Sequence, residues 1–169
     1  MRRVGLIADT HGLLRPEALA FLRGSDFIIH AGDVGDGAVL QQLGSLAPVT
    51  AVRGNNDKGS WAAALPETEV LKVGEVSIYV LHDIGGLDLD PVSAGCHVVV
   101  AGHSHRPSSE TRDGVLYVNP GSAGRRRFKL PISVGELRID EGSVTARLVE
   151  LEVPATGNVR KRTDDGRHA

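Results

Sequence analysis

Residues 4–22 read VGLIADTHGLLRPEALAFL, and this stretch contains the two kinds of element from which the first half of the chain is built. The apolar run from Val4 to Ala8 has the length of a strand and is followed by a polar loop that includes Gly12. Pro16 then begins a segment whose apolar residues recur at helical spacing. The stretch therefore predicts a strand, a loop and a helix in that order.

The same order of patterns recurs directly afterwards. An apolar run at 27–29 precedes Gly32, apolar residues at helical spacing occupy 39–46, and a third short apolar run covers 49–52. Strands that alternate with helices in this way predict parallel strands that are covered by helices.

From residue 69 onward the pattern changes to strands with few helices between them. The runs 70–73 and 76–81 are separated by a turn at Gly74, which predicts a hairpin, and 88–94 predicts a short helix. Further runs of strand length follow at 97–101, 115–118, 132–139 and 144–153. The last two alternate apolar and polar residues as an antiparallel pair does. We therefore expect two sheets, one from the early α/β half and one from the later β-rich half.

The length of 169 residues suits one domain, which we predict to cover residues 1–153. Residues 154–169 lack apolar periodicity and are rich in charge, which predicts a disordered C-terminal tail. A single cysteine, Cys96, cannot form an internal disulfide, and its apolar surroundings predict a buried thiol.

The composition also limits the classes of partner. Nineteen basic and 21 acidic residues give a formal net charge of -2, so no general positive field attracts nucleic acid. Aromatic residues make up 4% of the chain, which is too few for a platform that stacks bases. The apolar segment at the N-terminus is far shorter than a membrane span or a secretion signal. We expect a cytoplasmic protein that binds neither membranes nor nucleic acid.

Polar side chains with metal-binding atoms follow five of the apolar runs. These candidate ligands are Asp9, His11, Asp33, Asn55, His82, His103 and His105. In extended chain, residues two apart point to the same side, so Asp9 and His11 are expected to converge, and His103 and His105 likewise. Ligands collect at the carboxyl ends of parallel strands in α/β sheets. The sequence therefore predicts one metal site to which all five loops contribute.

Five short motifs follow one another along the chain in an order that resembles the calcineurin-like metallophosphoesterases. They are Asp9-Thr10-His11, Gly32-Asp33, Gly54-Asn55, His82 and Gly102-His103-Ser104-His105. Within that superfamily they are similar to the small bacterial and archaeal phosphodiesterase branch. The resemblance covers most of residues 4–122. It implies an α/β fold, namely a four-layer α/β/β/α sandwich of two packed sheets flanked by helices.

The resemblance also implies a pair of divalent metal ions and a role for each ligand. Asp9, His11 and His105 would bind the first ion, Asn55, His82 and His103 the second, and Asp33 would bridge them. Manganese is the expected metal, with iron, nickel, zinc and magnesium as alternatives. A hydroxide shared by the ions would attack phosphorus in line, with Asp33, Asn55 and His103 as the catalytic residues. The predicted activity is hydrolysis of a phosphodiester, and the expected partner is a small phosphate ester.

Two positions depart from the family pattern. Many relatives carry a histidine after the asparagine ligand, whereas this chain has Asn56, and an amide cannot protonate a leaving group. The phosphodiesterase branch commonly lacks that histidine as well, and its motif ends in an aspartate, as Asp57 does here. Relatives often have glycine after the histidine at position 82, where this chain has Asp83.

Two alternative functions share the same fold. One is a scaffold or interaction protein with weak catalysis, and the other is a phosphomonoesterase or nucleotide pyrophosphohydrolase that uses the same site. A homo-oligomer is compatible with the sequence. We expect His30 to be a hydrogen-bonded core or strand-end histidine, with a hydrogen bond from His30 to one of the metal ligands as the alternative. The sequence assigns no role to Trp61, Asn56, Asp57, Asp83 or the run Arg125 to Arg127.

Overall fold

A computed structural model describes residues 1–154 of the chain. The predicted C-terminal tail, apart from Pro154, lies outside the described residues, and the domain boundary at residue 153 stays a prediction. Within residues 1–154, every helix is too short or too polar to span a bilayer.

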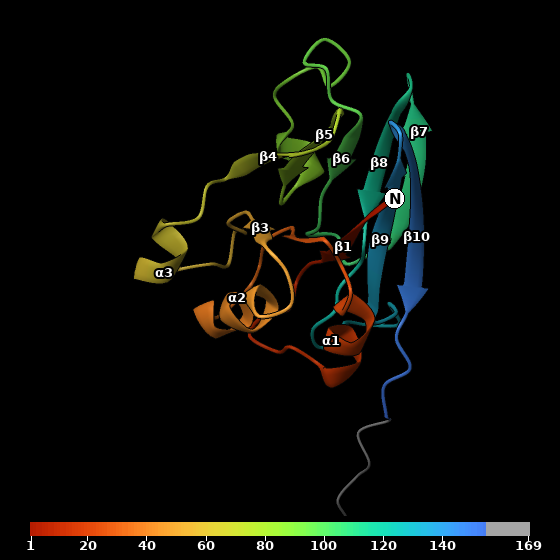
Figure 1. The fold of residues 1–169 in the computed structure, drawn as a ribbon. Helices are drawn as coiled ribbons and strands as arrows, with labels where there is room; N and C mark the ends of the chain where they lie inside the picture. The colour runs from red at the N-terminus through yellow and green to blue at the C-terminus, as the bar shows by residue number, and fades with distance from the viewer. Residues whose placement is uncertain (155–169) are drawn as a thin grey trace, which may run out of the picture.

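The first sheet has the strand order β10-β9-β1-β2-β3. Its strands are β1 (Arg2–Ile7), β2 (Phe27–His30), β3 (Val49–Ala51), β9 (Ser133–Asp140) and β10 (Ser143–Glu150). The early strands β1, β2 and β3 are parallel, as the alternation with helices predicts, while β9 runs antiparallel to β1 and to β10. Figure 1 shows the long blue hairpin of β9 and β10 beside the red strand β1.

The second sheet has the strand order β4-β5-β6-β8-β7. Its strands are β4 (Thr68–Val73), β5 (Val76–Leu81), β6 (Val98–Val100), β7 (Ser108–Arg112) and β8 (Val115–Asn119). The hairpin predicted around Gly74 is present as β4 and β5. The central strands β5, β6 and β8 are parallel, and the edge strands β4 and β7 are antiparallel to their neighbours.

The predicted division into an early and a late sheet is wrong for the last hairpin, because β9 and β10 return to the first sheet. The reason lies in β9, which is buried on both faces. Val134 packs in the cluster beneath the helices, whereas Leu137 and Ile139 pack between the sheets. A strand that is buried on both sides fits beside the central strand β1.

Helices cover one outer face of the sandwich. They are α1 (Pro16–Leu22) and α2 (Gly37–Gly44), which lie together on the outer side of the first sheet in Figure 1, followed by the short α3 (Ser60–Ala63). Leu22 and Leu43 are fully buried in one cluster with Ile28 of β2. Asp36 caps α2 by accepting a hydrogen bond of 2.9 Å from the backbone N–H of Ala38.

The outer face of the second sheet carries a thinner layer. It consists of the 3-10 helix η1 (Ile84–Gly86) and the following turns, from which Leu87 and Leu89 pack against Tyr79 and the rest of a small apolar cluster. The helix predicted at 88–94 is wrong. This segment forms turns, because the Asp90 carboxylate accepts hydrogen bonds from the backbone of Val92 and the hydroxyl of Ser93.

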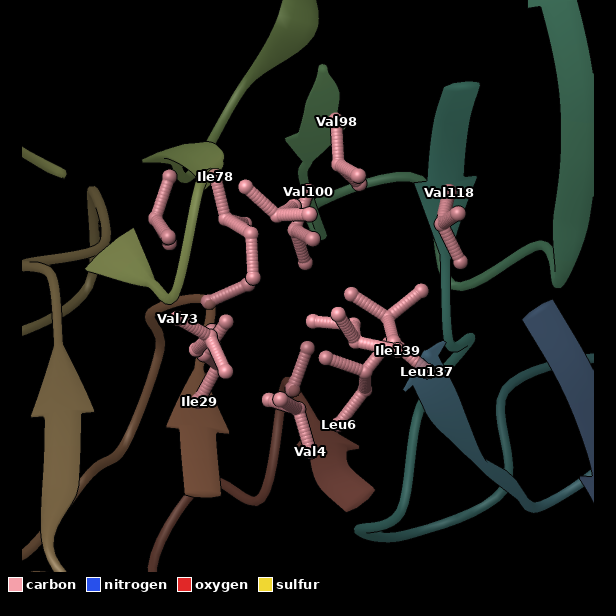
Figure 2. Packing of buried hydrophobic residues seen from close by; sticks show 14 of the residues in the cluster. Val4, Leu6, Ile29, Val73, Ile78, Val98, Val100, Val118, Leu137 and Ile139 are labelled. Atoms are coloured by element: carbon pink, nitrogen blue, oxygen red, sulfur yellow. The ribbon is translucent and has the colours of Figure 1, made fainter. Parts of the chain in front are cut away.

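The main core lies between the two sheets. Figure 2 shows Val4 and Leu6 of the first sheet facing Val98 and Val100 of the second, and all four side chains are fully buried. The fold is therefore the expected α/β sandwich, and its packed interior fixes the carboxyl ends of the parallel strands of both sheets relative to one another.

Candidate metal centre

Five loops at the carboxyl ends of parallel strands bring the candidate ligands together. Asp9 and His11 follow β1, Asp33 follows β2, Asn55 follows β3, His82 follows β5, and His103 and His105 follow β6. Backbone hydrogen bonds connect these loops: the N–H of Asp9 donates to the carbonyl of Gly32 at 3.0 Å. The N–H of Gly102 donates to the carbonyl of His82 at 2.9 Å.

One group of side chains consists of Asp9, His11 and His105. Each offers one atom, and these atoms lie within 4.8 Å of one another. Nε2 of His105 lies 3.5 Å from Oδ1 of Asp9, and the ring centroids of His11 and His105 are 5.6 Å apart. The spacing is compatible with a single cation held by the three side chains.

A second group consists of Asn55, His82 and His103. Oδ1 of Asn55 lies 3.0 Å from Nε2 of His82 and 3.2 Å from Nδ1 of His103. These two ring nitrogens are themselves 3.3 Å apart. The other nitrogen of His82, Nδ1, lies 2.8 Å from the carbonyl oxygen of Ala31, which leaves Nε2 directed into the group.

Asp33 lies between the two groups and contacts a histidine from each. Its Oδ2 is 3.3 Å from Nε2 of His82 and 3.7 Å from Nε2 of His11. Asn56 donates to both Asp33 oxygens, at 2.9 Å from its backbone N–H and at 3.0 Å from its side-chain amide. Asn56 thereby orients the Asp33 carboxylate.

Several buried polar atoms of the first group have no hydrogen-bond partner among residues 1–154. They are Oδ1 of Asp9, Nε2 of His11 and Nδ1 of His105. A buried polar atom without a partner costs about 1–3 kcal/mol. Because a mixed set of carboxylate oxygens and imidazole nitrogens suits divalent transition metals, the donor set fits a metal ion that would give Oδ1 of Asp9 and Nε2 of His11 a partner.

The backbone of the cluster adopts an uncommon conformation. Positive φ angles occur at Asp9 (54°), His11 (46°), Asp33 (53°), His103 (70°) and His105 (61°), none of which is a glycine. Such conformations cost roughly 1–3 kcal/mol each and concentrate at functional sites. The expected reason for convergence is therefore wrong: left-handed turns after β1 and β6, rather than extended chain, bring the paired ligands together.

Two glycines allow the loops to approach so closely. A Cβ atom at Gly32 would lie 2.6 Å from Nδ1 of His82. A Cβ atom at Gly54 would collide with the backbone nitrogen and the carboxylate of Asp33. Any larger residue at these positions would push Asp33 or His82 out of place.

The pKa values of the two carboxyl groups in the cluster shift in opposite directions, because their hydrogen-bond partners differ. Removal from water raises the pKa of Asp9 from 3.8 to about 7. At Asp33, burial also favours the neutral form, but hydrogen bonds from His82 and Asn56 outweigh it and hold the pKa well below its usual range. Asp33 is thus an anion in the metal-free protein, whereas Asp9 titrates near neutral pH.

The pKa values of the histidines in the cluster also shift in different directions. Burial lowers the pKa of His11, and burial together with the positive charge of Arg127 lowers the pKa of His105 to about 4. At His82 burial acts in the same sense, but contacts with Asp33 and the Ala31 carbonyl outweigh it and raise the pKa. His11 and His105 are therefore neutral at pH 7, which is the form that binds metals.

Residues around the cluster hold its loops in place. The carboxylate of Asp57 accepts from the backbone N–H groups of Gly54 (2.8 Å), Gly35 (2.9 Å) and Val34 (3.2 Å), so it ties the loop after β2 to the loop after β3. Fully buried His30 lies 2.9 Å from the Thr10 hydroxyl and accepts from the N–H of Gly32 at 3.1 Å. His30 is the hydrogen-bonded core histidine expected from the sequence.

The structure also shows where two residues lie to which the sequence assigned no role, namely Trp61 and Asp83. Trp61 packs in the cluster beneath the helices and beside Gly37, away from the candidate ligands. Oδ2 of Asp83 lies 3.7 Å from Nε2 of His103. The phrase Asn119-Pro120-Gly121 indicates either a tight turn or a loop near the site, and the structure shows both. The side-chain carbonyl oxygen of Asn119 accepts from the N–H of Gly121 at 2.9 Å, and its amide donates to the carbonyl of Gly102 at 2.9 Å and so fixes the loop that bears His103.

The amino-acid sequence is similar to that of known proteins over most of its length. Residues 2–142 match the model of the calcineurin-like phosphoesterase superfamily domain. A probable metallophosphoesterase of Methanothermobacter thermautotrophicus is 33% identical, over 94% of this chain and 98% of the relative. Another, from Methanocaldococcus jannaschii, is 33% identical over 88% of this chain and 81% of the relative.

Solved structures share the fold. An archaeal phosphodiesterase superposes with a TM-score of 0.72 at 22% identity, over 87% of this chain and 99% of that protein. Vps29 from Chaetomium thermophilum superposes with a TM-score of 0.71 at 21% identity, over 91% of this chain and all (100%) of that protein. At these identities the likeness concerns the fold alone.

Proposed function

Since this chain belongs to the calcineurin-like phosphoesterase superfamily, and is thus a metallophosphoesterase hydrolase, we propose that it cleaves phosphodiesters with two divalent metal ions. Asp9, His11 and His105 would hold one ion, and Asn55, His82 and His103 the other, with Asp33 shared. The observation that carries the proposal is the position of Asp33, whose Oδ2 lies within 3.7 Å of a histidine from each group.

A pair of divalent ions in this cluster would supply a water of lowered pKa and positive charge for the phosphoryl oxygens. The residues of the chain determine how much of that charge is available. The cluster has only two carboxylates, Asp9 and Asp33, while Asn55 contributes a neutral amide oxygen. A positive charge therefore remains to attract a phosphate ester, although the whole protein has a formal charge of -2.

Asn56 favours diesters with good leaving groups. Its backbone and side chain both donate to Asp33, so the residue positions a ligand and cannot act as a general acid. Without an acid at this position, the leaving oxygen departs as an anion, and aryl esters are favoured over alkyl esters. We propose manganese as the preferred ion, because nitrogen and oxygen donors are mixed in the cluster.

The direct test is manganese-stimulated hydrolysis of bis-p-nitrophenyl phosphate. Asp33→Ala and His103→Ala should abolish the activity, and metal analysis should find fewer ions bound to both variants. His97→Ala is the matched control, since His97 is an exposed histidine at the opposite end of β6. Asp33→Ala with the rate of the wild type would refute the proposal. Metal uptake without hydrolysis of any diester or monoester would instead favour the scaffold alternative.

The cytoplasmic location remains a proposal from the sequence, and so does a small phosphate ester as the partner.

A further inference from the structure

A pocket of about 150 Å³ lies beside the metal cluster on the outer face of the second sheet. Its floor is formed by side chains of three neighbouring strands, β6, β8 and β7. The residues of this floor are Val99, Ala101, Tyr117, Ser108, Glu110 and Arg112. Asp83, Ile84 and the Gly102–Ser104 loop form its wall.

His103 belongs both to this pocket and to the metal cluster. Its Nδ1 lies 3.2 Å from Oδ1 of Asn55, and its backbone N–H donates to Oδ2 of Asp9 at 3.1 Å. A group in the pocket therefore contacts the same residue that borders the candidate ion positions. A phosphate ester at the cluster can extend one of its substituents into the pocket.

The size and lining of the pocket favour one ring. A cavity of about 150 Å³ is large enough for a benzene-sized ring. The apolar side chains of Val99 and Ala101 form part of the floor, and Ile84, which is 43% exposed, provides an apolar wall. The Arg112 guanidinium lies 4.8 Å from the centroid of the Tyr117 ring and holds that ring at the base of the pocket.

The charge of the lining disfavours a second anionic group. Asp83 and Glu110 bring two carboxylates, and Arg112 is the one arginine or lysine among the lining residues. Arg112 is already paired with Glu110, with 3.0 Å between the nitrogen and the carboxylate oxygen. A further phosphate or carboxylate in the pocket would face a net negative lining.

We propose that this pocket binds an uncharged, single-ring organic substituent of the ester, so that the substrate is a diester with one phosphate and at least one aryl-sized group. The inference rests on the proposed function, since it assumes that phosphate is held at the metal cluster. It makes Ile84, Ser108 and Tyr117 determinants of specificity, and it disfavours substrates with a chain of phosphates.

The test measures binding and needs no turnover. Calorimetric titration of the manganese-loaded protein compares diphenyl phosphate with dimethyl phosphate, which have the same charge but differ in their rings. We expect diphenyl phosphate to bind at least tenfold more tightly, and bis(4-carboxyphenyl) phosphate, in which both rings carry a charge, to bind more weakly than diphenyl phosphate. Ser108→Trp should fill the pocket and reduce the preference for diphenyl phosphate to less than threefold.

Ser109→Trp is the matched control. Ser108 and Ser109 are both exposed on the edge strand β7 but point to opposite faces of the sheet. If Ser108→Trp fails to fold, Ile84→Ala, which removes an exposed wall, should reduce the ring preference at least threefold. Equal affinities of the two esters for the wild type, or the same loss in Ser108→Trp and Ser109→Trp, would overturn the pocket assignment.

The outcomes separate this inference from the proposed function. Hydrolysis of diesters without a ring preference in binding would refute the pocket and leave the function intact. A ring preference that Ser108→Trp removes, in a protein that hydrolyses no ester, would support the pocket and refute the function.

Discussion

Replacing Gly32 with alanine tests how tightly the loop after β2 packs against His82. The new Cβ atom would lie 2.6 Å from Nδ1 of His82, whereas ordinary contacts are 3.4 Å or longer. His82 would have to move by nearly an ångström, which would break the contact of 2.8 Å between its Nδ1 and the Ala31 carbonyl. Gly32 also has a φ of +96°, so alanine adds backbone strain.

The size of the effect follows from these two contributions. A left-handed conformation costs a non-glycine residue about 1–2 kcal/mol, and overpacking adds about 1–3 kcal/mol. We expect urea unfolding of Gly32→Ala to show a loss of about 2–5 kcal/mol. Because a misplacement of about 1 Å reduces catalysis roughly 100-fold, kcat/KM for bis-p-nitrophenyl phosphate should fall by that factor.

Gly24→Ala is the matched control for this experiment. Gly24 has a similar φ of +81°, but nothing lies within 4 Å of an added Cβ atom. It should lose only the strain contribution, about 1–2 kcal/mol, and keep the activity and metal content of the wild type. The reasoning fails if the two variants lose equal stability, or if Gly32→Ala retains its full rate and metal content.

Four further predictions concern the acidic residues around the cluster. The pKa of Asp9 is raised from 3.8 to about 7 in the folded protein, so its stabilising contribution is complete below its unfolded value and is lost as the pH rises through about 7. Urea unfolding of the metal-free wild type, relative to Asp9→Asn, should therefore show stability that decreases from about pH 4 to about pH 7. A constant difference would contradict the assignment. Manganese binding to the wild type should release a proton near pH 7, as measured by calorimetry in buffers of different ionisation enthalpy. Asp57→Ala should lower the free energy of unfolding by about 3 kcal/mol, because three backbone N–H groups lose their acceptor, and a loss below about 1 kcal/mol in urea would count against this role. Asp83→Asn should weaken manganese binding about tenfold in a calorimetric titration, since a carboxylate near Nε2 of His103 orients that ring. Unchanged affinity would contradict this role and leave Asp83 as a lining residue of the pocket and as the cap of η1, where its carboxylate accepts from the N–H of Gly85 at 2.9 Å.

The sequence predicts much of this architecture because its signals are local. Strand-length apolar runs followed by Asp9 or Asp33, and helical spacing after Pro16, correspond to elements that the structure contains. The order of the ligand phrases led to the family without any three-dimensional information. That order also led to seven side chains that the structure brings into two adjoining groups.

Other features depend on contacts that no local pattern encodes. The pairing of β9 with β1 joins segments far apart in the chain, and the alternation of apolar and polar residues at 132–139 does not indicate that β9 is buried on both faces. Strand β7 is exposed at every residue, so it carries no apolar periodicity. The left-handed backbone at His103 and His105 is likewise invisible in the sequence, because histidine rarely adopts that conformation without tertiary support.

The two sheets contribute unequally to the cluster, but neither contributes all of either group. Asp9 and His11 come from the first sheet and His105 from the second, while Asn55 comes from the first and His82 and His103 from the second. Each proposed ion would thus connect the two sheets, because its ligands come from segments that are distant along the chain. Metal binding would then add to the stability that the shared core gives the two sheets, and a chelator would remove that added stability from the metal-loaded protein.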